Sequence, residues 1–232
     1  MLLPQPLYPA TLMRRYKRFL ADLRLEDGRE VTAHLADPGR LPELSRPGLR
    51  AWLSFHDEPR RRLPWSLQLI QAPDGALVGM NTAAPNRLVA EALAEGRIPQ
   101  LGPIRQVVAE SVPAVGTRLD FRCTMEDGRT LWLEVKGVTW RRGNRLAFPD
   151  AVTARGTRHL RELARLAEAG DRAVLLFVAQ RADGVALEIA RDIDPAYDAA
   201  LALAMAAGVQ VLAFRCAVST TEVVLDEILP MV

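Results

Sequence analysis

Two acidic residues and a lysine stand in segments whose residue types alternate as in neighbouring β-strands. In residues 118–125 every second residue is apolar, which leaves Asp120 on the polar face of a predicted strand. In residues 131–136 the same alternation leaves Glu134 and Lys136 together on the polar face. Two carboxylates beside an ammonium group are typical of sites that hold a divalent cation and act on a phosphate ester.

The loop between these strands decides whether the acids meet. A two-residue turn at 127–128 would place Asp120 opposite Val135 and contradict both apolar patterns, because a shift of one residue exchanges the faces. A three-residue loop at 126–128, with its glycine in the left-handed conformation, places Asp120 opposite Glu134. Directly opposed Cβ atoms lie roughly 4.5–5.5 Å apart, where like charges are destabilising. The sequence therefore predicts a cation between the two carboxylates.

The expected cation is Mg²⁺ or Mn²⁺. Mg²⁺ accepts one or two carboxylates, keeps several waters and takes its other oxygens from substrate phosphates. Lys136 could orient or deprotonate an attacking water, or stabilise the pentavalent phosphate. The alternative is a solvated hairpin face on which Arg118 or Lys136 neutralises the acids. Two observations favour the cation: Glu91, in a helix predicted before these strands, could add a carboxylate, and Lys136 is one of two lysines among 30 basic residues.

The composition is that of a globular chain. Its 232 residues are 49% hydrophobic, enough for one large core or two small ones, and its formal net charge is +2. The two cysteines stand in apolar alternating runs, so neither a disulfide framework nor a zinc site is indicated. We find no signal-peptide pattern, and the longest uncharged run, 199–214, is too short to span a bilayer. A cytoplasmic protein without membrane segments is expected.

The chain divides into two parts with different patterns of predicted secondary structure. Up to about residue 80, short strand patterns alternate with turn signals, which favours a small β-barrel or sandwich. After residue 81, helical and strand patterns follow in the order α-β-β-β-α-β and then α-β. We therefore predict one domain over residues 1–82 and a second over residues 83–232.

Basic and aromatic residues are interleaved in segment 14–19, as expected of a strand that contacts phosphates while it stacks a base. The alternative is a half-buried strand with solvated arginines. The candidate nucleic-acid-binding residues of this segment are Arg15, Lys17, Arg18 and Phe19.

A second basic surface is predicted on the helix expected at 154–169. Arg155 and Arg158 lie on the side opposite its leucine stripe and are candidates for gripping a nucleic-acid backbone near the carboxylates. Arg165, on the same side, is expected to be only solvated. His34 and His159 have no His or Cys partner at metal-ligand spacing, which predicts a hydrogen-bonding role for them.

Two resemblances connect these residues to known proteins. The helix containing Glu91, then Asp120, then the run 134–136, resembles the core of the PD-(D/E)xK nuclease superfamily, although Leu119 stands where that superfamily usually has proline. Over nearly the whole chain, longer strings are similar to the sugar fermentation stimulation protein family. These strings are 15–22, 34–39, 81–82, 86–88, 118–121, 134–139, 148–153, 155–156 and 159–160.

The resemblance implies an α/β (α+β) protein with two parts. The first is an N-terminal OB-like β-barrel, a fold that commonly presents its surface to single strands, so that segment 14–19 becomes a candidate DNA contact. The second is a C-terminal PD-(D/E)xK, restriction-endonuclease-like domain with a mixed sheet flanked by helices.

The resemblance also assigns roles to the candidate residues. Carried over to this chain, Asp120 and Glu134 would be metal ligands and Lys136 the catalytic lysine. Glu91 would be an accessory carboxylate, and Glu110, at the end of a predicted strand, competes with it for that role.

Three functions compete at this point. The first is a DNA-binding protein, largely sequence-nonspecific and with single-stranded DNA among its candidate ligands, that carries a Mg²⁺-dependent phosphodiesterase site. The second is a non-enzymatic DNA-binding regulator linked to sugar (maltose) metabolism, in which the acids are a remnant. The third is a carbohydrate-binding module on the barrel, against which the arginine excess argues. The intact Asp–Glu–Lys set favours the nuclease.

Overall fold

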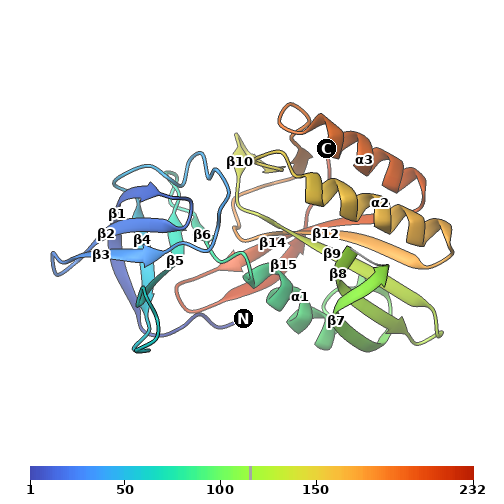
Figure 1. Cartoon of the computed structure of the whole chain (residues 1–232), viewed down its shortest axis with the longest axis horizontal. Helices are drawn as coiled ribbons and strands as arrows, with labels where there is room; N and C mark the ends of the chain where they lie inside the picture. Colours follow the sequence, from blue (N-terminus) through green and yellow to red (C-terminus); the bar gives the residue numbers. More distant parts are fainter. Residues whose placement is uncertain (115–116) are drawn as a thin grey trace.

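The protein consists of a β-barrel beside a layered α/β body (Figure 1). The computed structural model describes residues 1–114 and 117–232. The barrel contains β1 to β6, and the link from β6 leads directly into α1 of the second body.

Six strands form the barrel sheet, with alternate residues of each strand facing inward. The sheet order is β3-β2-β1-β4-β5-β6, and a parallel pairing of β3 with β5 closes it. Closure leaves few unpaired strand edges. The interior is apolar, with Leu12, Leu23 and Leu53 fully buried. The strands are β1 (Leu7–Tyr16), β2 (Leu20–Leu25), β3 (Glu30–His34), β4 (Arg50–Phe55), β5 (Trp65–Gln71) and β6 (Leu77–Gly79).

The second body is built on a mixed six-stranded sheet of order β15-β14-β12-β9-β8-β7. Strands β9, β12 and β14 are parallel, and the outer pairs are antiparallel. A small sheet, β10-β11-β13, lies outside it. The elements are α1 (Ala84–Ala94), a 3₁₀ turn (Pro99–Leu101), β7 (Ile104–Ala114), β8 (Thr117–Met125), β9 (Thr130–Val138), β10 (Arg141–Arg142), β11 (Arg145–Phe148), α2 (Ala154–Glu168), β12 (Arg172–Ala179), β13 (Leu187–Ile189), α3 (Pro195–Ala206), β14 (Gln210–Val218) and β15 (Val223–Ile228).

Helices cover both faces of this sheet. Leu88 and Ala92 of α1 pack into one apolar cluster, and Leu160 and Leu163 of α2 pack into the other together with α3. Figure 1 shows α2 and α3 side by side on the face opposite α1. Because β9 is a central strand between these layers, polar side chains on either of its faces are enclosed by protein. This placement is what buries Glu134.

Buried charges connect the barrel to the second body. Arg181, which follows β12, is fully buried and donates to both carboxylate oxygens of Asp183 at 2.6 Å. Its guanidinium also donates to Glu43 of the barrel at 2.5 Å. Arg141 adds a second bridge, to Asp74 of the barrel at 2.5 Å and to Asp183 at 3.2 Å. These contacts fix the orientation of the two bodies.

The first residues of the chain contact the second body. Leu2 forms an isolated bridge with Glu222, and the Leu3 N–H donates to the Thr221 carbonyl at 2.8 Å. The Leu3 side chain joins the apolar cluster that contains α1. The segment before β1 therefore spans both bodies, although the domain boundary predicted from the sequence groups it with the barrel.

The strand predicted across segment 14–19 is shorter than expected. It ends at Tyr16, and Lys17 and Arg18 have φ angles of +48° and +64° in the turn that follows. Few non-glycine residues adopt this region. The correction matters for function, because Lys17, Arg18 and Phe19 lie at an exposed turn instead of alternating along a strand.

The predicted fold class, a β-barrel followed by a mixed sheet flanked by helices, is confirmed. In residues 1–114 and 117–232, every helix falls short of the length and apolarity required to cross a membrane.

Candidate active site

The β8–β9 hairpin has the register predicted from its apolar alternation. Phe121 pairs with Leu133, which aligns Asp120 with Glu134 on the neighbouring strand. The loop ends at Gly128, whose φ of +84° is the left-handed conformation that glycine adopts without strain. The hairpin therefore brings the two carboxyl groups to adjacent positions.

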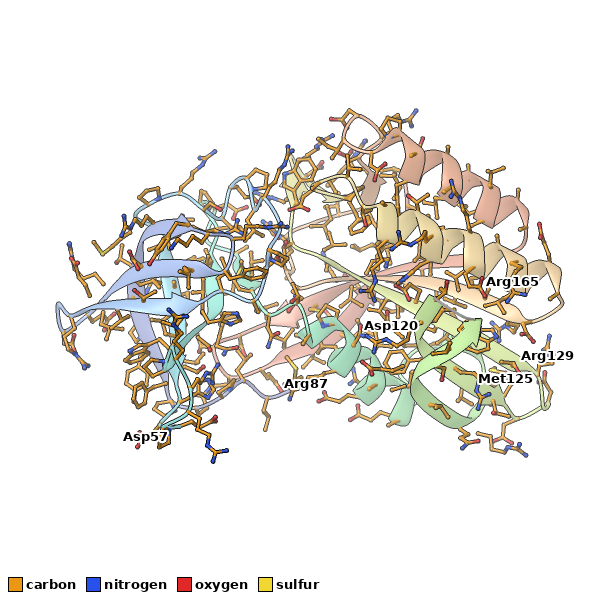
Figure 2. The ribbon with its side chains drawn as sticks, in the orientation of Figure 1. Asp57, Arg87, Asp120, Met125, Arg129 and Arg165 are labelled. Carbon is orange, nitrogen blue, oxygen red and sulfur yellow. The ribbon has the colours of Figure 1, made fainter. Side chains whose placement is uncertain are left out.

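Two hydrogen bonds hold the Asp120 carboxylate. Asn86 of α1 donates to Oδ1 and the Val135 N–H donates to Oδ2, each at 2.8 Å. Burial raises the pKa of Asp120, the nearby charge of Glu134 raises it further, and the two hydrogen bonds offset part of that effect. Figure 2 places Asp120 between α1 and α2, near the middle of the molecule.

Glu134 lies deeper, with 2% of its surface exposed. Its Oε1 accepts a hydrogen bond from the Lys136 ammonium at 2.6 Å and contacts Nδ1 of His159 in α2. Burial raises the pKa of Glu134, but the hydrogen bond from His159 and the charge of Lys136 outweigh it, so that the pKa lies below its usual value. The ionised form of Glu134 is therefore favoured inside the protein. Its burial excludes a solvated face, whereas its pairing with Lys136 is the neutralisation that the alternative expected.

The tautomer of His159 follows from its partners. Arg155 Nε donates to His159 Nε2 at 3.3 Å, so Nδ1 carries the ring hydrogen and donates to Glu134. The hydrogen-bonding role predicted for His159 is thus confirmed, and it links Arg155 to the carboxylate site.

One oxygen at the centre of the site has no partner. Oε2 of Glu134 is buried and accepts no hydrogen bond from the residues that the structure describes. An unsatisfied buried acceptor carries a desolvation penalty of about 1–3 kcal/mol or more. A hard cation shared with Asp120 would satisfy it. Within the described ranges, no group of three or more His, Cys, Asp or Glu side chains is arranged to hold a metal ion. Two protein carboxylates, with water and substrate oxygens, suit Mg²⁺ in particular.

Glu110 lies across from Asp120 on β7. The flanking pairs, Ala109 with Phe121 and Ser111 with Leu119, set this alignment. Glu110 has a φ of +54°, and its carboxylate, 68% exposed, pairs with Arg118 at 3.2 Å. A left-handed non-glycine residue costs about 1–2 kcal/mol. The structure therefore places Glu110 at the level of the site, with its side chain engaged elsewhere.

Glu91 is not brought to the site. Its carboxylate pairs with the Met1 amino group at 2.7 Å. It follows Asn86 by five residues, which is a rotation of roughly 140° around a helix. Since α1 presents Asn86 to Asp120, Glu91 lies on another side of the helix.

The basic residues predicted to bind nucleic acid fall into two groups. Arg15 donates to the carbonyls of Arg18 and Asp37, both at 3.0 Å, and burial lowers its pKa, so it braces the barrel loops. Lys17 and Arg18 are exposed. Phe19, also exposed, has its ring parallel to that of His34, with 6.4 Å between centroids and 10° between planes.

Arg155 and Arg158 are exposed in the first turns of α2. A cavity of about 660 Å³ lies between this end of α2 and the barrel, and is lined by Arg15, Arg18 and Arg40 and by residues 148–153. Asp120 and Glu134 are outside its lining. The cavity instead separates the two sets of basic residues, one on each body.

A closed β-barrel joined to a mixed sheet flanked by helices, with Asp120, Glu134 and Lys136 on two neighbouring strands of that sheet, defines a two-domain α+β protein. The chain belongs to the sugar fermentation stimulation protein family. Residues 83–222 match the family model "Sugar fermentation stimulation protein RE domain" and residues 13–80 match "SfsA N-terminal OB domain".

Relatives match over almost the full chain. The sugar fermentation stimulation protein homologue of Ruegeria sp. (strain TM1040) is 46% identical over 228 residues, covering 98% of each chain. That of Geobacter metallireducens is 46% identical over 235 residues, covering 100% of each. The solved structure "The structure of Pyrococcus Furiosus SfsA in complex with Ca2+" superimposes with a TM-score of 0.88 at 24% identity, covering 100% of this chain and 97% of that one, which shows the shared fold.

Two residues of the site were not assigned by the sequence. Asn86 donates to Asp120, which lies 34 residues away in the sequence. His159 contacts Glu134, which lies 25 residues away. Both Asn86 and His159 are in helices. Their types gave a weak signal, since a polar amide and an imidazole recur on the exposed faces of many helices.

Proposed function

We propose that this protein is a metal-dependent phosphodiesterase that acts on DNA held between the barrel and α2. The observation that carries the proposal is the buried, ionised Glu134 with one unpartnered oxygen, aligned with Asp120 and paired with Lys136. The nuclease-like fold and the relation to a family member solved with Ca²⁺ support a divalent cation, and Mg²⁺ or Mn²⁺ is the expected ion in this chain.

The residues divide the work by position. A cation held by Asp120 and Glu134 would polarise the phosphate and activate a bound water. Lys136, at 2.6 Å from Glu134 and 14% exposed, is placed to hold that water or to stabilise the charge that develops on the phosphate. Asn86 and the Val135 N–H keep Asp120 in place.

The substrate backbone is expected to cross from the barrel to α2. Lys17 and Arg18 on the barrel, and Arg155 and Arg158 on α2, supply exposed positive charge. The sequence carries no recognition-helix or zinc-finger signature, so binding should be largely independent of base sequence. Phe19 offers an exposed ring on which a base of a single strand can stack.

Replacing Asp120 by asparagine should abolish binding of Mg²⁺ and Mn²⁺. The substitution keeps the size of the side chain but removes the charge shared with Glu134. Calorimetric titration of each ion into wild type and variant measures the effect. Asp127→Asn, in the exposed turn of the same hairpin, is the matched control and should bind as the wild type does. Equal binding by Asp120→Asn would reject the site.

The reaction is tested on single-stranded DNA, double-stranded DNA and RNA, with Mg²⁺ and with Mn²⁺. Cleavage by wild type and not by Asp120→Asn supports the nuclease. Metal binding without cleavage of any substrate favours the non-enzymatic DNA-binding regulator. If the protein binds no metal, with or without DNA, Asp120 and Glu134 belong to an ion cluster with a structural role only.

Removing Lys17 and Arg18 together, by alanine substitution, should weaken DNA binding and lower the slope of log affinity against log salt by about 1–2. Both lie in an exposed turn, so folding should be unaffected. The matched control replaces Arg24 and Arg29, two exposed arginines with carboxylate partners towards the other end of β2. Binding titrations at two or more salt concentrations measure the slope. If both double variants behave alike, the β1–β2 turn is not a specific contact surface.

A further inference from the structure

A second pocket lies at the junction of the two bodies, apart from the carboxylate site. Its volume is about 300 Å³, near the lower end of the roughly 300–1,000 Å³ typical of small-ligand sites. Barrel strands form one wall and the start of α1 another. The residues that carry the inference are His34, His56, Arg61, Ser66, Arg87 and Gln180. We call it the junction pocket.

The charged side chains that line the junction pocket are of one sign. Arg61, Arg87 and two histidines line it, and none of its lining residues is Asp or Glu. In the part of the chain that the structure describes, neither Arg61 nor Arg87 forms a salt bridge. Burial lowers the pKa of His56, and the charge of Arg61 lowers it further. Glu58 acts on this pKa in the opposite direction but lies outside the lining, so the lining itself carries positive charge that an anion would neutralise.

Its donors are held in place by buried polar groups. Gln68 donates to Ser54 Oγ at 2.9 Å, and Ser54 Oγ lies 3.0 Å from His56 Nε2. The contact with Ser54 engages Nε2 of His56, so Nδ1 is the ring nitrogen left to interact with a ligand. Ser54 and Gln68 are both more than nine-tenths buried, so the imidazole is oriented before any ligand arrives.

Arg61 and the pocket floor are fixed in the same way. Arg61 Nη2 donates to Ser66 Oγ at 2.8 Å. Gln180, 2% exposed, donates to the Asn81 carbonyl at 3.1 Å. A Cβ on Gly79 would meet Gln180 Oε1 at 2.8 Å, so a side chain at position 79 would displace the Gln180 amide. Arg87, labelled in Figure 2, reaches the pocket from the start of α1.

We propose that the junction pocket binds a phosphate monoester, the dianionic group carried by the end of a nucleic-acid strand or by a small phosphorylated metabolite. Two guanidinium groups match phosphate oxygens in forked geometry, and an imidazole N–H and a serine hydroxyl add single donors. A dianion balances this number of positive groups better than a single carboxylate does. The site does not use Asp120 or Glu134 and so stands apart from the proposed phosphodiesterase.

The test is calorimetric titration of metal-free, full-length protein in EDTA, so that no phosphate binds through a divalent cation. The probes are inorganic phosphate, glycerol 3-phosphate, and oligothymidylates with a 5′-phosphate or a 5′-hydroxyl. We expect glycerol 3-phosphate or the 5′-phosphorylated strand to bind, and Arg61→Gln and Arg87→Gln each to weaken that binding at least tenfold. Arg62→Gln, an exposed neighbour outside the pocket, should leave it unchanged.

The arms of the experiment separate the two sources. At least tenfold preference for the 5′-phosphorylated over the 5′-hydroxyl strand assigns the pocket to a strand end. Binding of glycerol 3-phosphate with no difference between the strands assigns it to a small metabolite. The proposal is overturned if no monoester binds, or if Arg62→Gln has the same effect as Arg61→Gln. Because Arg87 is exposed on α1, its variant stays informative even if Arg61→Gln fails to fold.

Discussion

Replacing Lys136 by alanine is expected to lower the rate of phosphodiester cleavage by about 10²–10⁴-fold, the contribution typical of a positioned proton-transfer group. Metal binding should persist, because Asp120 and the free Oε2 of Glu134 remain. DNA binding should persist as well, since the exposed arginines are untouched. Single-turnover cleavage assays, with calorimetric titration of Mg²⁺ on the same preparations, measure the two properties separately.

A second substitution separates two roles for this lysine. Lys136→Arg keeps the positive charge beside Glu134 but cannot give up a proton near neutral pH. If Lys136 only neutralises Glu134 or the phosphate, arginine should restore most of the activity. If it transfers a proton, both variants should be inactive. Wild-type cleavage rates in Lys136→Ala would remove Lys136 from the mechanism.

The hairpin could be predicted from sequence because its two strands constrain each other. The alternation that contains Phe121 and the one that contains Leu133 agree in one register only, and Gly128 supplies the turn that this register needs. A period of two residues tolerates no slip. The alignment of Asp120 with Glu134 follows from these local facts alone.

The helical partners could not be predicted in the same way. Asn86 and Glu91 both occupy polar positions of α1, and only the rotation of the packed helix decides that Asn86 faces Asp120. His159 could be assigned a hydrogen-bonding role, but its partner Glu134 is set by how α2 packs on β9. Tertiary contacts decide which of these residues face the acids, and the periodicity of the local sequence does not reveal such contacts.

Short elements and unusual turns also could not be predicted from the sequence. The left-handed conformations of Lys17 and Arg18 have no glycine to signal them. Strand β15 has the alternation expected of a strand, with Val223 and Leu225 buried, but over six residues only. The buried ion pairs of Arg181 were missed because one arginine among 28 carries no sign that its partner, Glu43, lies in the other domain.

Arg181→Ala is expected to destabilise the protein by about 3–5 kcal/mol, the usual cost of removing one partner from a buried ion pair. It leaves the carboxylates of Asp183 and Glu43 without the guanidinium that contacts them at 2.5–2.6 Å. Equilibrium unfolding in urea at pH 7 measures the loss. Arg129→Ala, which removes an exposed pair with Asp127, is the control and should cost no more than about 1 kcal/mol.

The loss should depend on pH in a direction fixed by Asp183. Burial raises the pKa of Asp183, but its hydrogen bonds and ion pair with Arg181 outweigh burial and hold the pKa below the ordinary 3.8. In the wild type, the ion pair of Asp183 therefore contributes to stability at pH values above the pKa of Asp183 in the unfolded chain. This contribution is lost as pH falls through the lower pKa of Asp183 in the folded protein. Without Arg181, only the more distant Arg141 offsets the effect of burial on the pKa of Asp183, so a fall in pH destabilises the variant less than the wild type. The difference in unfolding free energy between the two should shrink as pH falls below the unfolded pKa of 3.8 towards the lower, folded pKa. A difference that stays constant over this range would show that Arg181 acts through packing alone and not through its charge.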